Sequence, residues 1–162
     1  MIMAGCLNDM EIRRYNKDDL SGVIRLFHDT VHLVNIRDYT KEQVDVWAPD
    51  SIDVDKWSKT LCQHHTFVAV ADSIIVGFGD IDDSGYLDRL YVHHDYQRQG
   101  VATKICEELE STVAHGMTIR THASITARPF FEKRGYEVVK EQFVERDGIF
   151  LKNYIMELPI HK

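Results

Sequence analysis

The segment Leu87–Glu110 contains the residues whose order most directly suggests chemistry. Up to Val92 it has the branched and aromatic bias of a buried strand, His93–Gln99 is polar apart from one tyrosine, and the apolar positions from Val101 onward recur with helical spacing. A helix that begins after Gly100 would direct unpaired backbone N–H groups at an anion. Because glycine has no Cβ, a ligand can approach the backbone closely there. The segment therefore predicts a binding site for a phosphate or pyrophosphate.

The same residues also fit a simpler interpretation, in which Gly100 only begins a helix and Arg98 is solvated. Two longer matches distinguish the interpretations. Gln97–Ala102 reads Gln-Arg-Gln-Gly-Val-Ala and resembles the Gln/Arg-x-x-Gly-x-Gly/Ala signature of the GNAT superfamily of acyl-CoA-dependent N-acetyltransferases. Ala127–Tyr136 resembles the motif that follows in this family, a short helix ending at Gly-Phe or Gly-Tyr. The two blocks stand in the family's order and spacing, and by element order the resemblance covers roughly residues 10–158.

The elements that must position this segment follow from apolar periodicity, caps and turn residues. Their order alone indicates an α+β or mixed α/β domain. It is also the order of the GNAT acyl-CoA N-acyltransferase fold, a central, mostly antiparallel twisted sheet flanked by helices, with splayed strands at the cofactor site. We expect one N-acetyltransferase domain over residues 10–162, preceded by a disordered extension over residues 1–9. The expected strands are 11–15, 66–71, 74–81, 86–92, 118–123, 136–144 and 149–158. The expected helices run from a cap at Asp18 or Asp19 to about Val34, from a Thr40-x-x-Gln43 capping box to Pro49, over 54–63 after an Asp53 cap, from Val101 to a stop at His115-Gly116, and over 126–134.

The composition is that of an ordinary soluble protein, with 44% hydrophobic and 28% charged residues. A net charge of −7 argues against a nucleic-acid partner and suits a cationic amine. No apolar run is long enough to cross a bilayer, so we expect no membrane partner. The three cysteines lack paired spacing, and Met3-Ala4-Gly5-Cys6 lacks the upstream regions of a signal peptide. Together with the resemblance, these features predict a bacterial, cytoplasmic protein, in which Cys106 is a core residue.

Two patterns imitate metal sites, and we expect no metal at either. Asp80-x-Asp82-x-Ser84-Gly85 imitates the start of a calcium loop, but Tyr91 stands where a bidentate Glu is needed, and strands flank the segment. His28 and His32 lie one helical turn apart without the Glu of a zinc-protease helix. In a chain with nine histidines such a pair is expected by chance.

The resemblance implies acetyl-CoA as the cofactor. In the family, backbone amides of the signature loop hold the pyrophosphate, to which Arg98 and Lys104 would add charged contacts. The strand before the loop pairs its backbone with the pantetheine arm, and an N–H near Tyr91 or Val92 polarises the thioester carbonyl. The cofactor-binding residues implied in this way are Leu90, Tyr91, Val92, Gln97, Arg98, Gln99, Gly100, Val101, Ala102, Thr103, Ser124, Phe130 and Phe131.

Acetyl transfer to an amine needs a base, because an alkylamine is protonated near neutral pH. Asp88, on the strand that leads to the loop, is the first candidate. Asp80, Asp82 and His122 are the other candidates. Each carboxylate also fits the alternative of a solvated turn or edge residue.

The chain departs from the family pattern at Phe131, where many members have a tyrosine that protonates the departing CoA thiolate. Three accounts are open. Another hydroxyl serves, with Tyr91, Tyr96 and Tyr154 as candidates; or the thiolate leaves unassisted, since an alkyl thiol with a pKa of about 8.5 is a tolerable leaving group; or the protein binds acyl-CoA without good catalysis. We favour unassisted departure and retain Asp88, Tyr91 and Tyr154 as catalytic candidates.

The acceptor site would be covered, by family analogy, by the helices between residues 18 and 62. Tyr39–Pro49 and Ser124–Phe131 resemble a bacterial subgroup called YafP-like, from which no substrate carries over. Aromatic faces in this region can receive a cation, although core roles fit the same residues. The substrate-binding candidates are His28, His32, Tyr39, Trp47 and His122.

These patterns predict an N-acetyltransferase that moves the acetyl group of acetyl-CoA to a primary amine of a small molecule. We expect direct transfer in a ternary complex, because no cysteine lies in the signature loop. One alternative is an acyl-CoA-binding sensor or regulatory module with little or no catalysis, and a second is an enzyme with a longer or charged acyl donor. Family members are often dimers, so a homodimer paired through the last hairpin is also expected.

Overall fold

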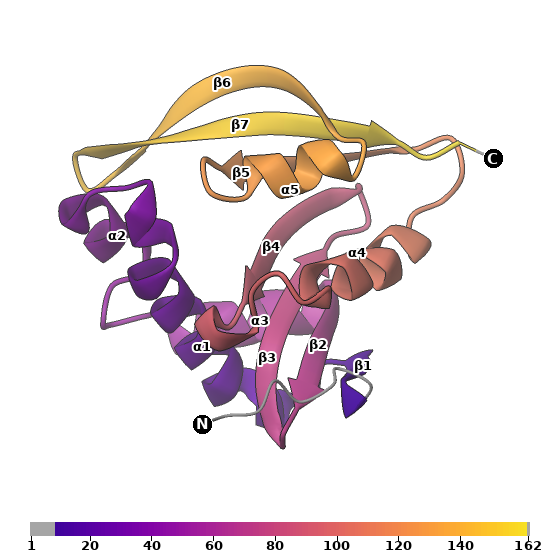
Figure 1. Ribbon diagram of the computed structural model, residues 1–162, viewed down its shortest axis with the longest axis horizontal. Coiled ribbons are helices and arrows are strands. Elements are labelled where there is room, and N and C mark those ends of the chain that lie inside the picture. Colours follow the sequence, from indigo (N-terminus) through magenta and orange to yellow (C-terminus); the bar gives the residue numbers. More distant parts are fainter. Residues whose placement is uncertain (1–8, 162) are drawn as a thin grey trace.

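The strands and helices follow one another in the predicted order (Figure 1). The computed structural model describes residues 9–161, so the predictions for residues 1–8, including Cys6, lie outside it. The strands are β1 (Glu11–Arg14), β2 (His65–Ala71), β3 (Ile74–Ile81), β4 (Tyr86–Val92), β5 (Thr118–Ser124), β6 (Glu137–Arg146) and β7 (Ile149–Pro159). The α-helices are α1 (Leu20–Leu33), α2 (Lys41–Trp47), α3 (Val54–Gln63), α4 (Val101–Ser111) and α5 (Arg128–Lys133). Short 3₁₀ turns are η2 (Lys17–Asp19), η3 (Asn35–Arg37) and η4 (His94–Tyr96).

The strands form one seven-stranded sheet in the order β1-β2-β3-β4-β5-β7-β6. The β4–β5 pair is parallel and every other described neighbouring pair is antiparallel. The predicted mixed α/β fold with a mostly antiparallel sheet is therefore confirmed. No helix among residues 9–161 is both long and apolar enough to span a membrane.

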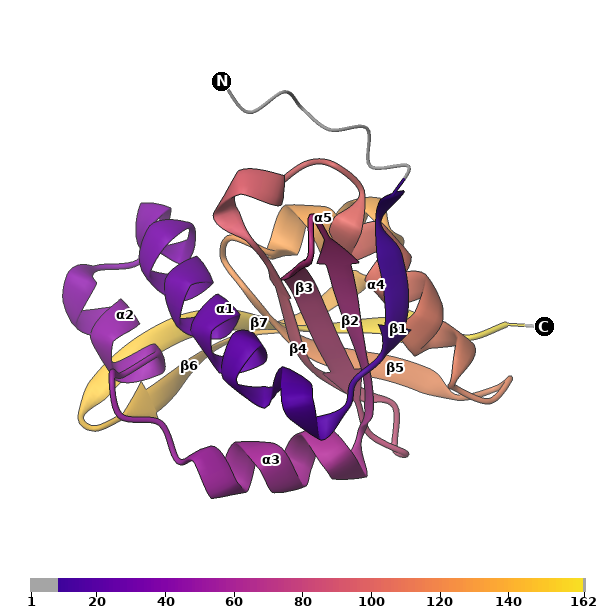
Figure 2. The same ribbon diagram turned by 90° about the horizontal axis from the view of Figure 1, so that it is seen from below.

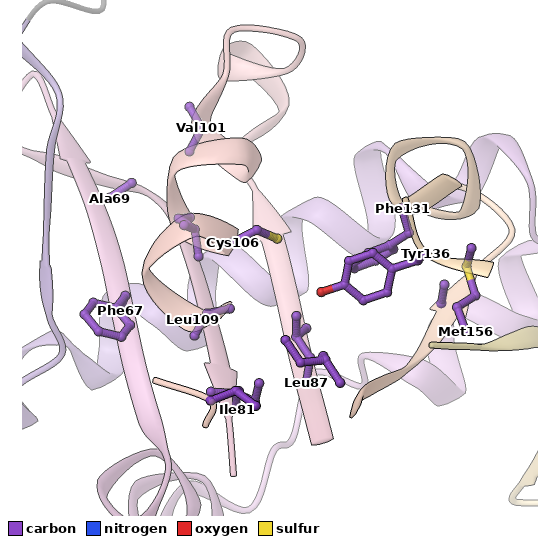
Figure 3. Packing of buried hydrophobic residues seen from close by; sticks show 14 of the residues in the cluster. Phe67, Ala69, Ile81, Leu87, Val101, Cys106, Leu109, Phe131, Tyr136 and Met156 are labelled. Carbon is purple, nitrogen blue, oxygen red and sulfur yellow. The ribbon is translucent and has the colours of Figure 1, made fainter. Parts of the chain in front are cut away.

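The helices cover the two faces of the sheet and bury two separate apolar clusters (Figure 2). One cluster lies under α1, α2 and α3 and includes Phe27 and Phe78. The other lies under α4 and α5; Figure 3 shows Cys106 and Leu109 of α4 facing the strands, with Leu87 of β4 beside them. Cys106 is fully buried, as predicted, and burial raises the pKa of its thiol to about 12.

The caps of the first three helices show what local sequence does and does not specify. Thr40 and Gln43 form the predicted capping box, and Asp53 caps α3 as predicted. Asp19 is the N-cap residue of α1, as predicted, but its side chain makes no cap hydrogen bond to that helix. Asn16 caps η2, and its side chain accepts from the Asp18 N–H, while Asp19 accepts from the Asn16 N–H and pairs with Arg13 at 2.8 Å. A nearby arginine thus recruits the predicted cap into an ion pair.

The C-terminus of α4 also differs from the prediction. The helix ends at Ser111 rather than at His115-Gly116. The hydroxyls of Ser111 and Thr112 donate to the carbonyl oxygens of Glu108 and Leu109, at 2.6 and 2.7 Å. These side-chain bonds satisfy carbonyls of the last turn and so compete with continuation of the helix. Gly116, at φ +88°, turns the chain toward β5 instead.

The sheet opens between β4 and β5, where the cofactor site was predicted. The two strands pair at Tyr86–Arg120 and Leu87–Thr121, and the pairing recorded for the described residues ends there. α5 packs on the β5 side of the opening, and Arg134, just after α5, pairs with Glu110 of α4 at 2.6 Å. The predicted splay is confirmed, and the second sequence motif is what ties its two sides together.

Candidate active site

A cavity of about 840 Å³ opens where β4 and β5 separate. Its wall combines β4, the loop through η4, the start of α4, β5, α5 and residues from α1, η3 and α2. The cavity is large enough for a cofactor together with a small acceptor. Of the residues that the sequence assigned to the cofactor, those lining the cavity are Leu90, Tyr91, Val92, Gln97, Arg98, Gly100, Val101, Ala102, Thr103, Ser124, Phe130 and Phe131.

The start of α4 has the geometry of an anion cradle. Gly100 has φ +82°, and a Cβ built there would meet no atom within 4 Å. The Lys104 N–H donates to the Gly100 carbonyl at 3.1 Å as the first bond of the helix. The amides of Val101, Ala102 and Thr103 precede that bond and therefore have no intrahelical acceptor. These N–H groups, with the positive end of the helix dipole behind them, fit a pyrophosphate.

Two glutamines of the signature loop differ in what they do. Gln97 Nε2 donates to the Val92 carbonyl at 2.6 Å, so this side chain closes the loop back onto β4. Thr30 Oγ1 of α1 donates to the same carbonyl at 3.3 Å. Gln99 reaches the Asp95 carbonyl at 3.3 Å and does not line the cavity. The side chain of Gln97 therefore shapes the loop, whereas the structure does not bring Gln99 to the predicted cofactor site.

Beyond its short pairing with β5, every second residue of β4 directs its backbone N–H and C=O groups toward the opening. The register with β3 pairs Gly77 with Val92 and Gly79 with Leu90. His93 N–H donates to the Val76 carbonyl at 2.8 Å. Since bonded and non-bonded pairs alternate in an antiparallel ladder, the N–H groups of Leu90 and Val92 face away from β3. Of the two N–H groups predicted to polarise a thioester, the geometry therefore favours that of Val92 over that of Tyr91.

A β-bulge sets the position of Asp88. Asp80 pairs with Arg89 and Ile81 pairs with Leu87, so Asp88 is an extra residue on β4. Such an insertion redirects the side chains at the bulge. Asp88 lines the cavity and its side chain is 31% exposed. Desolvation raises the pKa of its carboxyl, and the charge of Asp80 raises it further.

Behind Asp88 lies a buried carboxylate with two donors. Asp80 is fully buried, and its Oδ2 accepts from Arg89 at 2.7 Å and faces His64 Nδ1 at 2.8 Å. Its Oδ1 has no hydrogen-bond partner among the described residues. The Arg89 guanidinium also stacks 4.3 Å from the centre of the Trp57 ring. Donor atoms of His64, Asp80 and Asp88 lie within 4.8 Å of one another.

Comparison with known proteins identifies this architecture. The family model described as "Acetyltransferase (GNAT) domain" matches residues 35–158. The chain belongs to the GNAT acetyltransferase family. It is accordingly an acyltransferase, and acetyl-CoA is its cosubstrate.

Individual relatives agree with the family assignment. The protein "Uncharacterized N-acetyltransferase YafP" of Escherichia coli K12 is 32% identical over 150 residues, which cover 93% of this chain and 96% of that protein. A GCN5-related N-acetyltransferase structure from Rhodopseudomonas palustris has a TM-score of 0.87 and 28% identity, covering 93% of this chain and 95% of the other. The PaiA N-acetyltransferase of Thermoplasma acidophilum, solved with coenzyme A, has a TM-score of 0.73 and 20% identity, covering 93% and 99%. The predicted GNAT resemblance is thus confirmed.

Several residues that the sequence suggested for the acceptor do not line the GNAT cavity. The hydroxyl of Tyr39 donates to the Lys152 carbonyl at 2.6 Å and accepts from the Ile125 N–H at 2.9 Å, so Tyr39 joins β7 to the segment after β5. His32 Nε2 contacts the Ala48 carbonyl at 2.7 Å, and His28 Nε2 contacts Asp50 at 2.9 Å. These bonds hold the loops around α2. Trp47 and His122 do line the cavity.

The three tyrosines considered as proton donors are differently placed. Tyr91 lines the cavity, but its hydroxyl accepts from Trp47 Nε1 at 3.2 Å, and burial raises its pKa. Tyr96 lines the cavity and donates to Asp72 at 2.7 Å. Tyr154 lies outside the cavity lining, beneath the Arg128 guanidinium at 4.4 Å. Phe131 is 2% exposed and packs edge-on against Tyr136.

Some cavity residues that the sequence did not indicate come from α1 and η3. Thr30, Asn35 and Arg37 line it. Nothing local marks them, because they reach the cavity only when α1 folds back across β4. The nearest feature that the sequence did predict is the Thr40 cap, which marks the start of α2, the helix after η3.

The groups that imitate metal sites have other functions in the structure. Asp82 Oδ1 accepts from the N–H groups of Ser84 and Tyr86, which makes the Asp80–Gly85 segment a side-chain-bonded turn. The rings of His28 and His32 stack at 4.3 Å. In the His64–Asp80–Asp88 group, the guanidinium of Arg89 already pairs with Asp80. Its positive charge would repel a metal ion bound at the same carboxylate.

Proposed function

We propose that this GNAT protein transfers the acetyl group of acetyl-CoA to a primary amine of a small molecule, directly and within a ternary complex. One observation carries the proposal: Asp88, projecting from a bulge of β4, lines the same cavity as the Gly100 anion cradle. A base and a cofactor cradle on one wall are what direct transfer requires.

The donor side of the reaction uses backbone groups. The amides of residues 100–103 would hold the pyrophosphate, with Arg98 supplying charge. The outward N–H and C=O groups of Leu90 would pair with the pantetheine arm, in the manner of an added strand. The outward N–H of Val92 would stabilise the negative charge that develops on the thioester oxygen.

The acceptor side requires a neutral amine. An alkylamine has a pKa near 10 and is protonated at neutral pH, so its nitrogen must lose a proton before attack. Asp88 accepts this proton, and the raised pKa of its carboxyl brings it closer to the working pH. Trp47 and Tyr91 offer aromatic faces to the cation before it is deprotonated. The CoA thiolate leaves unassisted, because Phe131 has no proton to donate.

A covalent acyl-enzyme is not part of this proposal. Cys62 is exposed on α3, and Cys106 is buried with its pKa raised to about 12. Neither lines the cavity. Of the cysteines within residues 9–161, none is therefore placed to attack the thioester.

The thiol-release assay tests the proposed function. Acetyl-CoA is offered with polyamines, amino acids, aminoglycosides and aminoalkyl compounds, and CoA release is followed. Turnover with one class establishes the enzyme and its acceptor type. Binding of acetyl-CoA without turnover on any amine would favour the sensor alternative, for which Phe131 is the supporting observation. A faster reaction with longer or charged CoA thioesters would show that one of these, rather than acetyl-CoA, is the preferred acyl donor.

Self-association, a single domain over residues 10–162 and a cytoplasmic location remain predictions. The support for self-association is that β6 is an edge strand of the sheet and exposes Val139 and Phe143, which are 56% and 61% accessible. We expect a homodimer through the β6–β7 hairpin. Sedimentation measures the oligomeric state, and a Phe143→Ser substitution should weaken the dimer. A wild-type protein that is monomeric at all concentrations would contradict the proposed homodimer.

A further inference from the structure

The pair formed by His64 and Asp80 has no part in the reaction as proposed above, yet it adjoins the base. His64 is the C-cap of α3, and its side chain is 17% exposed. A donor atom of His64 lies within 4.8 Å of an Asp88 carboxylate oxygen. His64 thus lies near Asp88, is partly exposed to solvent and has an ionisable ring.

Each turnover leaves Asp88 with one proton, which it must lose before the next reaction. An alkylammonium carries three protons on nitrogen and the amide product carries one. Of the two protons lost, one ends on the CoA thiol and the other must reach solvent. An Asp88 that retained its proton would be unable to serve the next acceptor. Because Asp88 lines the cavity that the cofactor and the acceptor would fill, and His64 does not, the proton needs an exit on the side away from the cavity.

We propose that His64 is a proton relay for Asp88, held in position by Asp80. Asp88 takes a proton from the ammonium; the proton then passes from the Asp88 carboxyl, through bridging water, to the free ring nitrogen of His64; and His64 releases it to solvent. No bond other than these N–H and O–H bonds changes. Asp88 and His64 return to their starting states, and the inference rests on the proposed function, since it requires Asp88 to be the base.

The geometry supports each step of this transfer. Donation of Nδ1–H to Asp80 fixes the tautomer of neutral His64 and leaves Nε2 as the acceptor. One ring nitrogen of His64 lies within 4.8 Å of an Asp88 carboxylate oxygen, so the ring is close enough for bridging water to connect the two groups. Asp80 is a rigid anchor, because it is fully buried and also bonded to Arg89. Arg89 in turn is held against Trp57.

The charges around His64 act on its pKa in both directions. The hydrogen bond to Asp80 raises the pKa of His64, while partial burial lowers it; the charges of Asp80 and Asp88 raise it and that of Arg89 lowers it. Asp82 also contributes at Asp88, where it raises the pKa of the carboxyl. The net effect is a raised pKa of His64, with the hydrogen bond to Asp80 as its largest cause.

The His64→Gln variant tests the relay while keeping the hydrogen bond to Asp80. The glutamine amide can still donate to Asp80, but it cannot take up or release a proton. The matched control is His65→Gln, since His65 is the next residue and pairs with the exposed Asp83 at 2.9 Å. With acetyl-CoA and 2-phenylethylamine, or a faster amine from the screen, we expect kcat to fall roughly 10-fold or more in His64→Gln. The control should stay at the wild-type rate, and both variants should bind CoA normally.

Two readouts separate a relay from a merely structural role. Wild-type kcat should fall as the pH drops through the pKa of His64, because a protonated ring accepts nothing, and this limb should move to lower pH in His64→Gln. Added imidazole should restore part of the rate of His64→Ala and not that of Asp88→Asn. An unaltered rate, or a slow rate with an unaltered pH profile and no rescue, overturns the relay.

The Asp88→Asn variant keeps the two hypotheses apart. If it is inactive while His64→Gln is normal, the base stands and the relay is wrong. If Asp88→Asn remains active, or if wild-type protein turns over no amine, the proposed function fails, and the relay fails with it. If His64→Ala is unstable, His64→Gln alone decides through its pH profile.

Discussion

The proposed donor half of the cavity, Leu90–Thr103, is one continuous stretch of chain and offers mainly backbone groups for the proposed contacts. The proposed acceptor half is assembled from side chains of α1, η3, α2, β4 and β5, which are far apart in the sequence. A backbone site depends on local conformation, such as the left-handed Gly100 and the free turn of α4. A side-chain site depends on how distant elements pack. The two halves should therefore respond differently to substitution.

The largest expected effect is on the acceptor half. Asp88→Asn removes the base without a change of shape, so kcat should fall by roughly 10²–10⁴-fold. The affinity for CoA should stay within about twofold, because Asp88 does not belong to the backbone cradle. Steady-state kinetics and calorimetry on the same preparation measure both. A loss of CoA binding would show that the two halves are not separable.

The matching substitution in the donor half is Gly100→Trp. A Cβ at this position meets no atom within 4 Å, and the indole would obstruct the cradle, so the affinity for CoA should fall roughly 100-fold. The positive φ of +82° adds backbone strain to any side chain here. Gly148→Trp is the control, since Gly148 has φ +81° and equally open surroundings in the turn between β6 and β7. An unchanged CoA affinity in folded Gly100→Trp would refute the cradle.

A stability measurement sharpens the comparison on the acceptor side. The hydrogen bond to Asp80 raises the folded-state pKa of His64, so its ionic stabilisation is complete below about pH 6.5 and is lost as the pH rises through that pKa. The melting temperature of the wild type should exceed that of His64→Gln by more at pH 5.5 than at pH 9. A gap that widens with rising pH would mean that the histidine is bound in its neutral form.

The smallest expected effect comes from Phe131→Tyr. If the thiolate leaves unassisted, restoring the hydroxyl of other family members should change kcat by less than about threefold. Some loss of stability is expected, because the ring is 2% exposed and packs tightly against Tyr136. Thiol release near pH 6, where a departing thiolate most needs a proton, is the sensitive assay. A large gain there would show that departure limits the wild-type enzyme.

The sequence predicted what local chemistry determines. Gly100, the capping box of Thr40 and Gln43, and the position of Asp88 before the signature loop are all readable along the chain, and all appear in the structure. It missed features that depend on competing side chains. The side chain of Asp19 pairs with Arg13 and accepts from the Asn16 N–H instead of capping α1, and no helix pattern in the sequence predicts this.

The acceptor half was the least predictable part for the same reason. His28, His32 and Tyr39 were plausible by type, but their hydrogen bonds go to neighbouring loops and strands. The relation of His64 to Asp80 joins the end of α3 to the middle of β3. The bulge that inserts Asp88 appears only in the register between β3 and β4.

Calorimetric titration of the wild-type protein with acetyl-CoA tests the central claim most directly, because every other assignment depends on the donor half binding this molecule. We expect one binding site per chain, with the affinity reduced in Gly100→Trp and retained in Asp88→Asn. Absence of binding by the wild type, or equal binding by Gly100→Trp, would contradict the account of how this cavity works.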